Sequence, residues 1–415
     1  MQGTQPWQGG GSKTKSNIWL YGCLAIAGML ILGMGGCFVL VLGIGVLGAD
    51  SDSQPAASVA APASGGEAPK STSPPKAVKQ AVRSRQTLFA LMDDGSVYYS
   101  GIKPGSKFGL FAQVVAYQHH PAVVDGLAKI TQIAPGIVAA CALDHAGAVY
   151  CWGDNAMGQL ATGSKGGVHL KPVMVAGLGK VRQISGQGFA FCALAEAGTV
   201  KCWGATLSDE AENFTRKAVV TATEVRDLTG VKKVAVGGGH ACAVLNDASV
   251  RCWGSNYAGA LGDGTEVTSS TPVVARGVAD AIDVAAGGSH SCALLKSGRV
   301  WCWGAAGGVG VSGKASQLIP VDVGLEGVEQ LDAVEDFSCV KLKAGKISCW
   351  GSIAPLAAST ETPQVVAGLD QVQDLKAGVA LQTDGKVVIW GPPLVGYPGF
   401  NEKRMSYCPP SLVQW

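Results

Sequence analysis

Charged residues are scarce in this sequence of 415 residues, and neither sign dominates. Lys, Arg, Asp and Glu make up 15% of the chain, and the formal net charge is +2. A protein that binds nucleic acid through its phosphates needs a basic patch or stripe, so the composition disfavours a nucleic-acid partner. The Cys-x-x-Cys spacing typical of zinc sites is also missing. The sequence predicts no nucleic-acid partner and no metal site.

One long segment, residues 18–49, contains no charged residue at all. It exceeds the roughly 20 residues that a helix needs to cross the hydrocarbon core of a membrane, so it predicts a transmembrane helix that serves as a signal anchor. A cleaved signal peptide is the alternative, but its apolar region should span only about 7–15 residues. Lys13 and Lys15 precede the segment, while Asp50 and Asp52 follow it. The positive-inside rule then places the N-terminus in the cytoplasm and the rest of the chain outside.

Composition divides the remaining chain into three parts. Residues 1–17 form the short cytoplasmic segment, and residues 50–76 are rich in Pro, Ala and Ser. Such a composition cannot bury a core and predicts a flexible linker. Residues 77–415 carry apolar patterning throughout. They are expected to form the folded body.

The body contains a unit that recurs seven times. Its copies span residues 89–101, 141–153, 192–204, 242–254, 292–304, 339–351 and 379–391. Successive copies begin 52, 51, 50, 50, 47 and 40 residues apart. This period suits one four-stranded blade per copy, so the sequence predicts an all-β, seven-bladed propeller.

Each copy resembles a β-hairpin with a short loop. Two alternating apolar runs flank a turn, and the seventh position is Gly in six copies, as in Gly198. A Gly there suits a three-residue loop in which a type I turn ends in a left-handed residue. Ala248 is the exception and is expected to carry local strain or a different turn. Two positions later every copy has Val or Ile, which is expected to face the sheet packing.

The strands around the hairpins predict how the ring closes. An apolar strand precedes each hairpin, as in VRQI at 181–184, and a strand that usually contains Pro comes before that one. The first copy lacks such a Pro-containing strand, whereas the chain ends in PPSLVQW at 409–415. The C-terminal strand is therefore expected to complete the N-terminal blade and close the ring, which would remove exposed sheet edges.

Ten of the 13 cysteines occur as five pairs with constant spacing. The partners of each pair face one another across a hairpin, which is the arrangement that a cross-strand disulfide requires. In the first and last copies both cysteines are replaced together, by Phe89 with Tyr99 and by Val379 with Ile389. Joint loss favours disulfides over the alternatives, buried thiols and metal ligands, and disulfides indicate an oxidising compartment. The pairs are Cys141 and Cys151, Cys192 and Cys202, Cys242 and Cys252, Cys292 and Cys302, and Cys339 and Cys349.

The repeated C-A-L, turn Gly and V-x-C-W-G pattern resembles the regulator of chromosome condensation repeat family. The best copies continue into GDNAMGQL at 153–160 and GSNYAGALGDG at 254–264. The resemblance covers about residues 77–415, implies a seven-bladed propeller, and is greatest to the cysteine-bearing bacterial exported branch. The founding member is a nucleotide exchange factor that binds chromatin, whereas a secreted relative inhibits β-lactamase as a protein-binding surface. The family therefore implies a fold but not one function.

Two groups of residues could form sites but are interpreted as structural. His240 and His290 hold equivalent places, and no acidic or nucleophilic residue recurs with them. The recurring tryptophans could form a carbohydrate platform, but their position beside a repeated Gly favours the blade core. They are Trp152, Trp203, Trp253, Trp303, Trp350 and Trp390. No catalytic residue and no cofactor site are predicted.

The irregular connections are the candidate partner-binding surface. Tyr397, Phe400, Arg404 and Tyr407 combine aromatic groups with Arg, a mixture enriched at binding hot spots. Together these features predict a membrane-anchored propeller in the cell envelope that binds or scaffolds an unidentified protein and is not an enzyme. One alternative is an envelope enzyme that acts on glycan or cell-wall material, with acids meeting in the central channel. The other is a guanine-nucleotide exchange factor in the cytosol.

Overall fold

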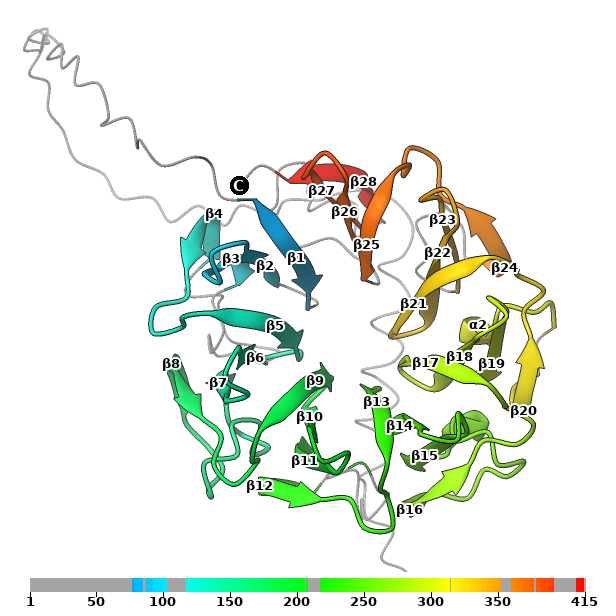
Figure 1. The fold of residues 1–415 in the computed structure, drawn as a ribbon, viewed down its shortest axis with the longest axis horizontal. Coiled ribbons are helices and arrows are strands. Elements are labelled where there is room, and N and C mark those ends of the chain that lie inside the picture. The colour runs from blue at the N-terminus through cyan, green and yellow to red at the C-terminus, as the bar shows by residue number, and fades with distance from the viewer. Residues whose placement is uncertain are drawn as a thin grey trace, which may run out of the picture. The chain divides into compact units, whose positions relative to one another are not determined.

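Seven four-stranded antiparallel sheets surround a central axis in the computed structural model (Figure 1). The structure describes residues 77–413 apart from 85–86, 103–116, 206, 208–216, 314, 352–359, 377 and 392–407. The fold confirms the all-β, seven-bladed propeller. The predicted membrane segment 18–49 lies outside the described residues. Within the described part of the chain, no helix has the length and apolar character that a membrane crossing requires.

Each blade uses four consecutive strands, numbered from the axis outwards. The innermost strands are β1 (Val78–Arg83), β5 (Ile130–Pro135), β9 (Val181–Gln187), β13 (Val231–Val236), β17 (Ala281–Ala286), β21 (Val328–Val334) and β25 (Val372–Lys376). The second strands are β2 (Thr87–Met92), β6 (Ala139–Asp144), β10 (Ala190–Ala195), β14 (His240–Leu245), β18 (His290–Leu295), β22 (Phe337–Leu342) and β26 (Val379–Gln382). The third strands are β3 (Val97–Ile102), β7 (Val149–Asp154), β11 (Val200–Ala205), β15 (Val250–Gly254), β19 (Val300–Gly304), β23 (Ile347–Gly351) and β27 (Val387–Gly391).

The outermost strands contain the recurring prolines. They are β4 (Tyr117–Val123), β8 (Val168–Met174), β12 (Ala218–Glu224), β16 (Ser269–Val274), β20 (Gln317–Asp322), β24 (Thr360–Val365) and β28 (Cys408–Val413). Two short helices, η2 (Tyr257–Gly259) and α2 (Ala306–Val309), lie between the third and fourth strands of blades 4 and 5. Proline suits these positions because the outermost strand leaves one edge without a ladder partner in its own sheet.

The hairpin turns have the predicted conformation in all seven copies. In blade 3 the Gly198 amide donates to Ala195 O and the Ala195 amide donates to Thr199 O, both at 2.9 Å, which is a type I turn followed by a left-handed residue. Gly198 has φ +82°. Ala248 keeps the same turn with φ +62°, so the expected strain is present at the only copy that has a side chain there.

The five cysteine pairs form disulfides, as the sequence predicted. Cys192 and Cys202, for example, are direct partners in the register of β10 and β11. The Cα atoms of the five pairs are 4.0–4.1 Å apart. Nine of the ten cysteines are fully buried, and Cys202 is half-buried. The disulfides therefore belong to the core of the propeller.

The core lies between blades and repeats around the ring. In six of the seven blades a Trp of the third strand packs against the second and third strands of the preceding blade, so that Trp203 contacts the cluster that contains Cys141 and Cys151. In blade 1 the aromatic pair replaces the disulfide, and Phe89 meets Trp152 edge to face at 5.9 Å. This packing explains why both cysteines of a pair change together, because both half-cystines contribute to one interblade cluster.

The expected closure by the C-terminal strand is wrong. β28 pairs with β27 and completes the last blade, whereas blade 1 is complete with its own strands β1 to β4. The Pro-containing strand is the outer strand of the hairpin that precedes it, not the first strand of the following blade. Blades 7 and 1 are joined by packing of Leu88 against Val379 and Ile389, and by Arg83 Nη1, which donates to Trp390 O at 2.5 Å.

Candidate functional site

The residues predicted to bind a partner lie in the connection between β27 and β28. Tyr397, Phe400, Arg404 and Tyr407 fall within residues 392–407, outside the described part of the chain. The proposed role of this connection therefore stays a prediction.

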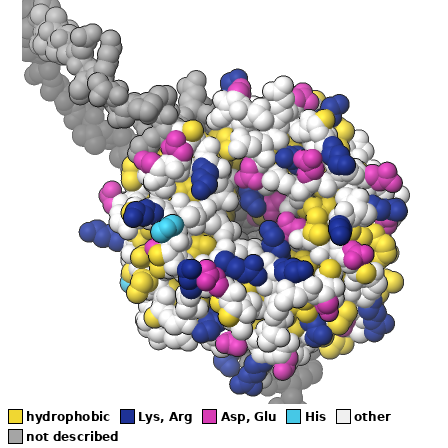
Figure 2. Space-filling model, viewed as in Figure 1, with side chains coloured by type: hydrophobic (Ala, Val, Ile, Leu, Met, Phe, Trp, Pro, Cys, Tyr) yellow, Lys and Arg dark blue, Asp and Glu magenta, His cyan; other side chains and the backbone are white. Residues whose placement is uncertain are grey.

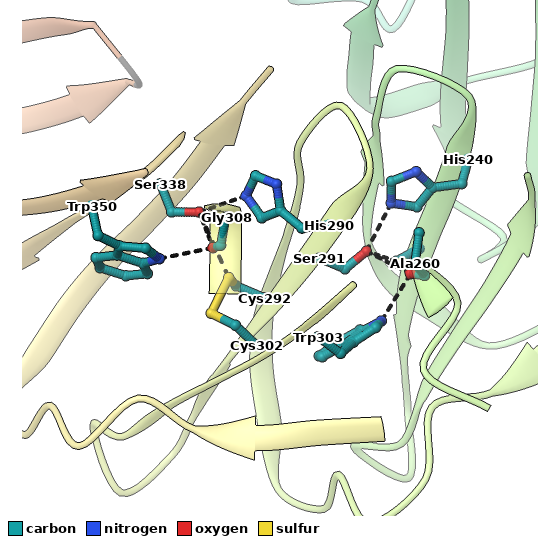
Figure 3. The surroundings of a disulfide bond; sticks show 11 residues. His240, Ala260, His290, Ser291, Cys292, Cys302, Trp303, Gly308, Ser338 and Trp350 are labelled. Carbon is teal, nitrogen blue, oxygen red and sulfur yellow. Dashed lines mark hydrogen bonds between the residues drawn. A yellow bond between two sulfur atoms is a disulfide. The ribbon is translucent and has the colours of Figure 1, made fainter. Parts of the chain in front are cut away.

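The two repeated histidines are buried links between blades (Figure 3). His240 Nε2 lies 2.8 Å from Ser291 Oγ of the next blade, and His290 Nε2 lies 2.7 Å from Ser338 Oγ in the same way. Ser291 Oγ also donates to Ala260 O at 3.0 Å. Each histidine side chain is 1% exposed. The interpretation of these residues as hydrogen-bonded structural histidines is confirmed.

Burial keeps both imidazoles neutral. It lowers the pKa of His240 to about 4, against a smaller opposing effect of a hydrogen bond to the backbone of His290. It lowers the pKa of His290 to about 3, and the nearby His240 lowers it further. A neutral, buried histidine bonded to a buried serine cannot reach a substrate, so this pair does not form a hydrolytic site.

The tryptophans are core residues and do not form a surface platform. All six are 0–3% exposed. Trp203, Trp303 and Trp350 donate through Nε1 to carbonyl oxygens of the preceding blade at 2.8–2.9 Å. All six rings are thus inaccessible to a carbohydrate, and three of the indole groups also link neighbouring blades by hydrogen bonds.

The innermost strands surround a central cavity of about 920 Å³. Arg182, Lys232 and Lys233, from β9 and β13, line one side. Asp283 from β17 and Asp332 from β21 line the other. Figure 2 shows charged side chains of both signs around the central hollow. Seen in cross-section, the cavity wall is therefore basic over blades 3 and 4 and acidic over blades 5 and 6.

Lys376 of β25 stands beside the acidic side of the cavity. Asp332 raises the pKa of Lys376, burial opposes this rise, and Asp374 and Asp283 add to it. The ammonium group therefore stays protonated at neutral pH. The carboxylates that line the cavity are Asp283, Asp332, Glu335 and Asp336, and all of them belong to the neighbouring blades 5 and 6. They do not face each other across the cavity, which was the arrangement expected of an envelope enzyme.

At one end of the cavity, the connections between first and second strands bond to one another. The Ile137 amide donates to Gly188 O at 2.8 Å, and the Gly238 amide donates to Gly287 O at 2.9 Å. With its amide oriented to satisfy both groups, Gln187 donates to Ala286 O at 2.9 Å. These bonds join blades 2 to 5 and fix the position of the cavity wall. Among the described residues, no three His, Cys, Asp or Glu side chains come together to hold a metal ion.

Family comparison agrees with this geometry. Models described as the regulator of chromosome condensation (RCC1) repeat match residues 146–193, 231–260 and 281–307. The chain contains RCC1 repeats. The matched segments run from the hairpin turn of blade 2 into β10 of blade 3, and over the first three strands of blades 4 and 5. Sheets with the same strand order complete the ring.

Several solved structures share this fold. Prp20p from Saccharomyces cerevisiae, whose structure was described with its binding to Gsp1p and histones, has a TM-score of 0.64 at 20% identity over 82% of this chain and 87% of that one. Yeast RCC1 (Prp20) bound to Kap60 gives 0.63 at 18% identity over 84% and 90%. Human WBSCR16 gives 0.55 at 22% identity over 64% and 72%. At these identities the likeness shows the fold alone. A comparison with curated proteins gives no match.

The RCC1 repeats of this chain are joined by glutamines at the third position of the innermost strand. Gln183 Nε2 donates to Val234 O at 2.8 Å, and Gln183 Oε1 accepts from the Val234 amide at 3.2 Å. Gln132 makes the same two bonds to Ile184, both at 2.9 Å. Gln80 and Gln330 each accept from the corresponding amide of the next blade, at 3.1 and 3.0 Å.

Three repeats have a charged residue at this third position: Lys233, Asp283 and Asp374. The sequence interpretation missed them because it centred on the hairpins. An alignment of the innermost strands contains the signal, since VRQ at 181–183 is followed by VKK at 231–233 and AID at 281–283. Within an otherwise repeated interface, these positions mark where the chain departs from its own pattern.

Proposed function

We propose that the protein is a membrane-anchored, extracytoplasmic propeller that binds a protein partner and acts as a scaffold. The five disulfides within the blades carry this proposal, because structural disulfides persist in oxidising compartments and are rare in reducing ones. The charge-free segment 18–49 supplies the anchor, and Lys13 and Lys15 on its N-terminal side place the propeller outside the cytoplasm.

The positions of the described histidines and carboxylates favour binding over catalysis. His240 and His290 are buried, and Asp283 and Asp332 do not face each other across the cavity. A rigid ring, with a disulfide inside each of five blades, suits a surface that binds a partner without a change of shape. The predicted contact residues of this surface are Tyr397, Phe400, Arg404 and Tyr407.

Location is tested with the full chain in intact cells and a membrane-impermeant amine reagent. Lys180 and Lys386 have side-chain exposures of 61% and 58%, so both should be labelled without permeabilisation. Lys13 and Lys15 should be labelled only after permeabilisation. Labelling of the propeller lysines only after permeabilisation would contradict an outside location.

Partner binding is tested by cross-linking of the full chain in its membrane, followed by mass spectrometry. A variant in which Tyr397, Phe400, Arg404 and Tyr407 are all replaced by Ala should lose a specific cross-linked protein. Lys386→Ala is the matched control, because this residue lies on an exposed hairpin of the same blade and should leave cross-linking unchanged. Equal cross-linking by all three proteins would refute the role of the 392–407 connection.

A further inference from the structure

The connections between the third and fourth strands of blades 2 and 4 share one internal scaffold. In blade 4, Asn256 is fully buried, its Nδ2 donates to Val267 O at 3.1 Å, and its Oδ1 accepts from the Leu261 amide at 2.9 Å. In blade 2, Asn155 is fully buried as well, and its Oδ1 accepts from the Leu160 amide at 3.0 Å. A buried asparagine therefore fixes the backbone of each connection from within.

The two connections differ in the side chains that they expose. Tyr257 and Val267 of blade 4 are each 72% exposed, more than any other large apolar side chain of the described residues. Counted from the two asparagines, Ala156 and Gly166 hold the equivalent places in blade 2. The shared scaffold therefore requires neither of the large side chains. Two exposed apolar groups on one rigid connection are typical of a surface that binds another protein.

The backbone of blade 4 is strained next to Tyr257. Ala258 has φ +58°, a left-handed conformation that is costly for a residue with a side chain, whereas the equivalent Met157 of blade 2 has no positive φ. Ala258 is buried and Tyr257 is exposed, so the strained turn lies directly beneath the most exposed aromatic ring. Strained residues cluster at sites that bind ligands or partners.

A carboxylate adjoins Val267 and adds a charge to this surface. Glu266 is exposed and makes no ion pair and no side-chain hydrogen bond within the described part of the chain. Lys165 holds the equivalent place in blade 2, so the scaffold does not require an acidic residue here. A free carboxylate attracts a cationic group, and the face of the Tyr257 ring attracts one as well.

We propose that Tyr257, Glu266 and Val267 bind a segment of the protein partner in which Lys or Arg stands beside a large aliphatic side chain. The aliphatic group packs against Tyr257 and Val267, and the cationic group pairs with Glu266. This inference rests on the proposed protein-binding function and adds a second contact surface to it.

Strand order places this surface on the same side of the ring as the predicted contact residues. Each sheet is antiparallel and uses its four strands in chain order, so third and fourth strands are joined on one side of the ring in every blade. The ends of β27 and β28 that flank the 392–407 connection therefore lie on the side that carries Tyr257. One partner can contact both surfaces.

The test uses the full chain in its membrane, with photoreactive p-benzoylphenylalanine in place of Tyr257. Irradiation should link this position to one protein, and mass spectrometry of the linked peptide should identify a segment that contains Lys or Arg beside a large aliphatic residue. The same photoreactive residue in place of Ala156, in the equivalent connection of blade 2, is the control and should not link to that segment. A linked segment without Lys or Arg would overturn the proposal.

Affinity is then measured with the identified segment as a fluorescent synthetic peptide and the full chain in detergent. The peptide with Gln in place of its Lys or Arg should bind about tenfold more weakly. The double variant Tyr257→Ala with Glu266→Lys copies the side chains of blade 2 and should weaken binding of the unaltered peptide by about tenfold as well. Lys165→Ala should bind as the unaltered chain does. Unfolding temperatures verify that the variants fold, and equal affinity in all these measurements would overturn the proposal.

Failure of this surface is distinguishable from failure of the proposed function. If position 257 links to no protein while the 392–407 variant still loses a specific cross-linked partner, the surface is refuted and the protein-binding function stands. If neither experiment recovers a specific partner, both are refuted.

Discussion

Replacement of Gln183 by Leu tests whether the inner glutamines hold the ring together. Leu keeps the approximate size of the side chain but removes both bonds to Val234, at 2.8 and 3.2 Å. A hydrogen bond contributes about 0.5–1.5 kcal/mol net, so two bonds contribute about 1–3 kcal/mol. Because Val234 lies beside a water-accessible cavity, its freed backbone groups can be rehydrated. We therefore expect a loss of about 1–2 kcal/mol.

Differential scanning calorimetry of the full chain measures this loss. A change of 1 kcal/mol shifts Tm by about 2–4 °C in a chain of 150–250 residues and by less in a larger one, so Gln183→Leu should lower Tm by about 1–4 °C. All proteins must be scanned at one rate, because large disulfide-bonded proteins often unfold irreversibly.

The equivalent position in the next blade supplies a matched variant for which we expect a gain in stability instead of a loss. Lys233→Gln should donate a new bond to the carbonyl of Val284, whose amide is already bonded to Asp283 at 2.9 Å. One net bond should raise the free energy of unfolding by about 1 kcal/mol. If Gln183→Leu leaves Tm unchanged, or Lys233→Gln lowers it, the glutamine bonds do not stabilise the interblade interface.

Three further changes probe the turn, the histidines and the disulfides. Ala248→Gly should raise stability by about 1 kcal/mol in denaturant unfolding, because Gly adopts φ near +62° without a steric penalty. Stability should fall as pH drops below about 6.5. The unfolded chain then binds protons at His240 and His290, whereas in the folded chain their pKa values of about 4 and 3 keep both imidazoles neutral. His240 alone should account for about 3 kcal/mol at low pH, and the double variant with Phe at both histidines should flatten this dependence in thermal unfolding. Replacement of Cys192 by Val and Cys202 by Ile, the pair found in blade 7, should lower the free energy of unfolding by about 2–3 kcal/mol. Mass spectrometry should then detect no effect of a reductant on that hairpin. An unchanged unfolding midpoint would contradict a stabilising role of this disulfide.

Most of the blade architecture was predictable because it depends on short stretches of chain. The turn at Gly198 needs a left-handed residue, and Cys192 and Cys202 face each other across that same turn. Both relations involve residues within a few positions of one hairpin, so spacing alone reveals them. The blade count follows from the number of copies.

The assignment of strands to blades was only partly predictable. The Pro-containing strand lies between two hairpins in the sequence and could pair with either, and the choice depends on which sheet edge the chain reaches first. The structure pairs β28 with β27, which leaves blade 1 complete without it. Ring closure therefore depends on the packing of Leu88 against Val379 and not on a shared sheet.

The sequence by itself determined seven hairpin units, their turns and their cysteine pairing, because each is a local relation repeated at a constant spacing. Tertiary structure alone decided that Lys233 and Asp283, 50 residues apart in the chain, stand on neighbouring parts of one cavity wall. The two charges face one cavity only because the ring brings the innermost strands around one axis. The hairpin periodicity gives no information about how close Lys233 and Asp283 lie in space.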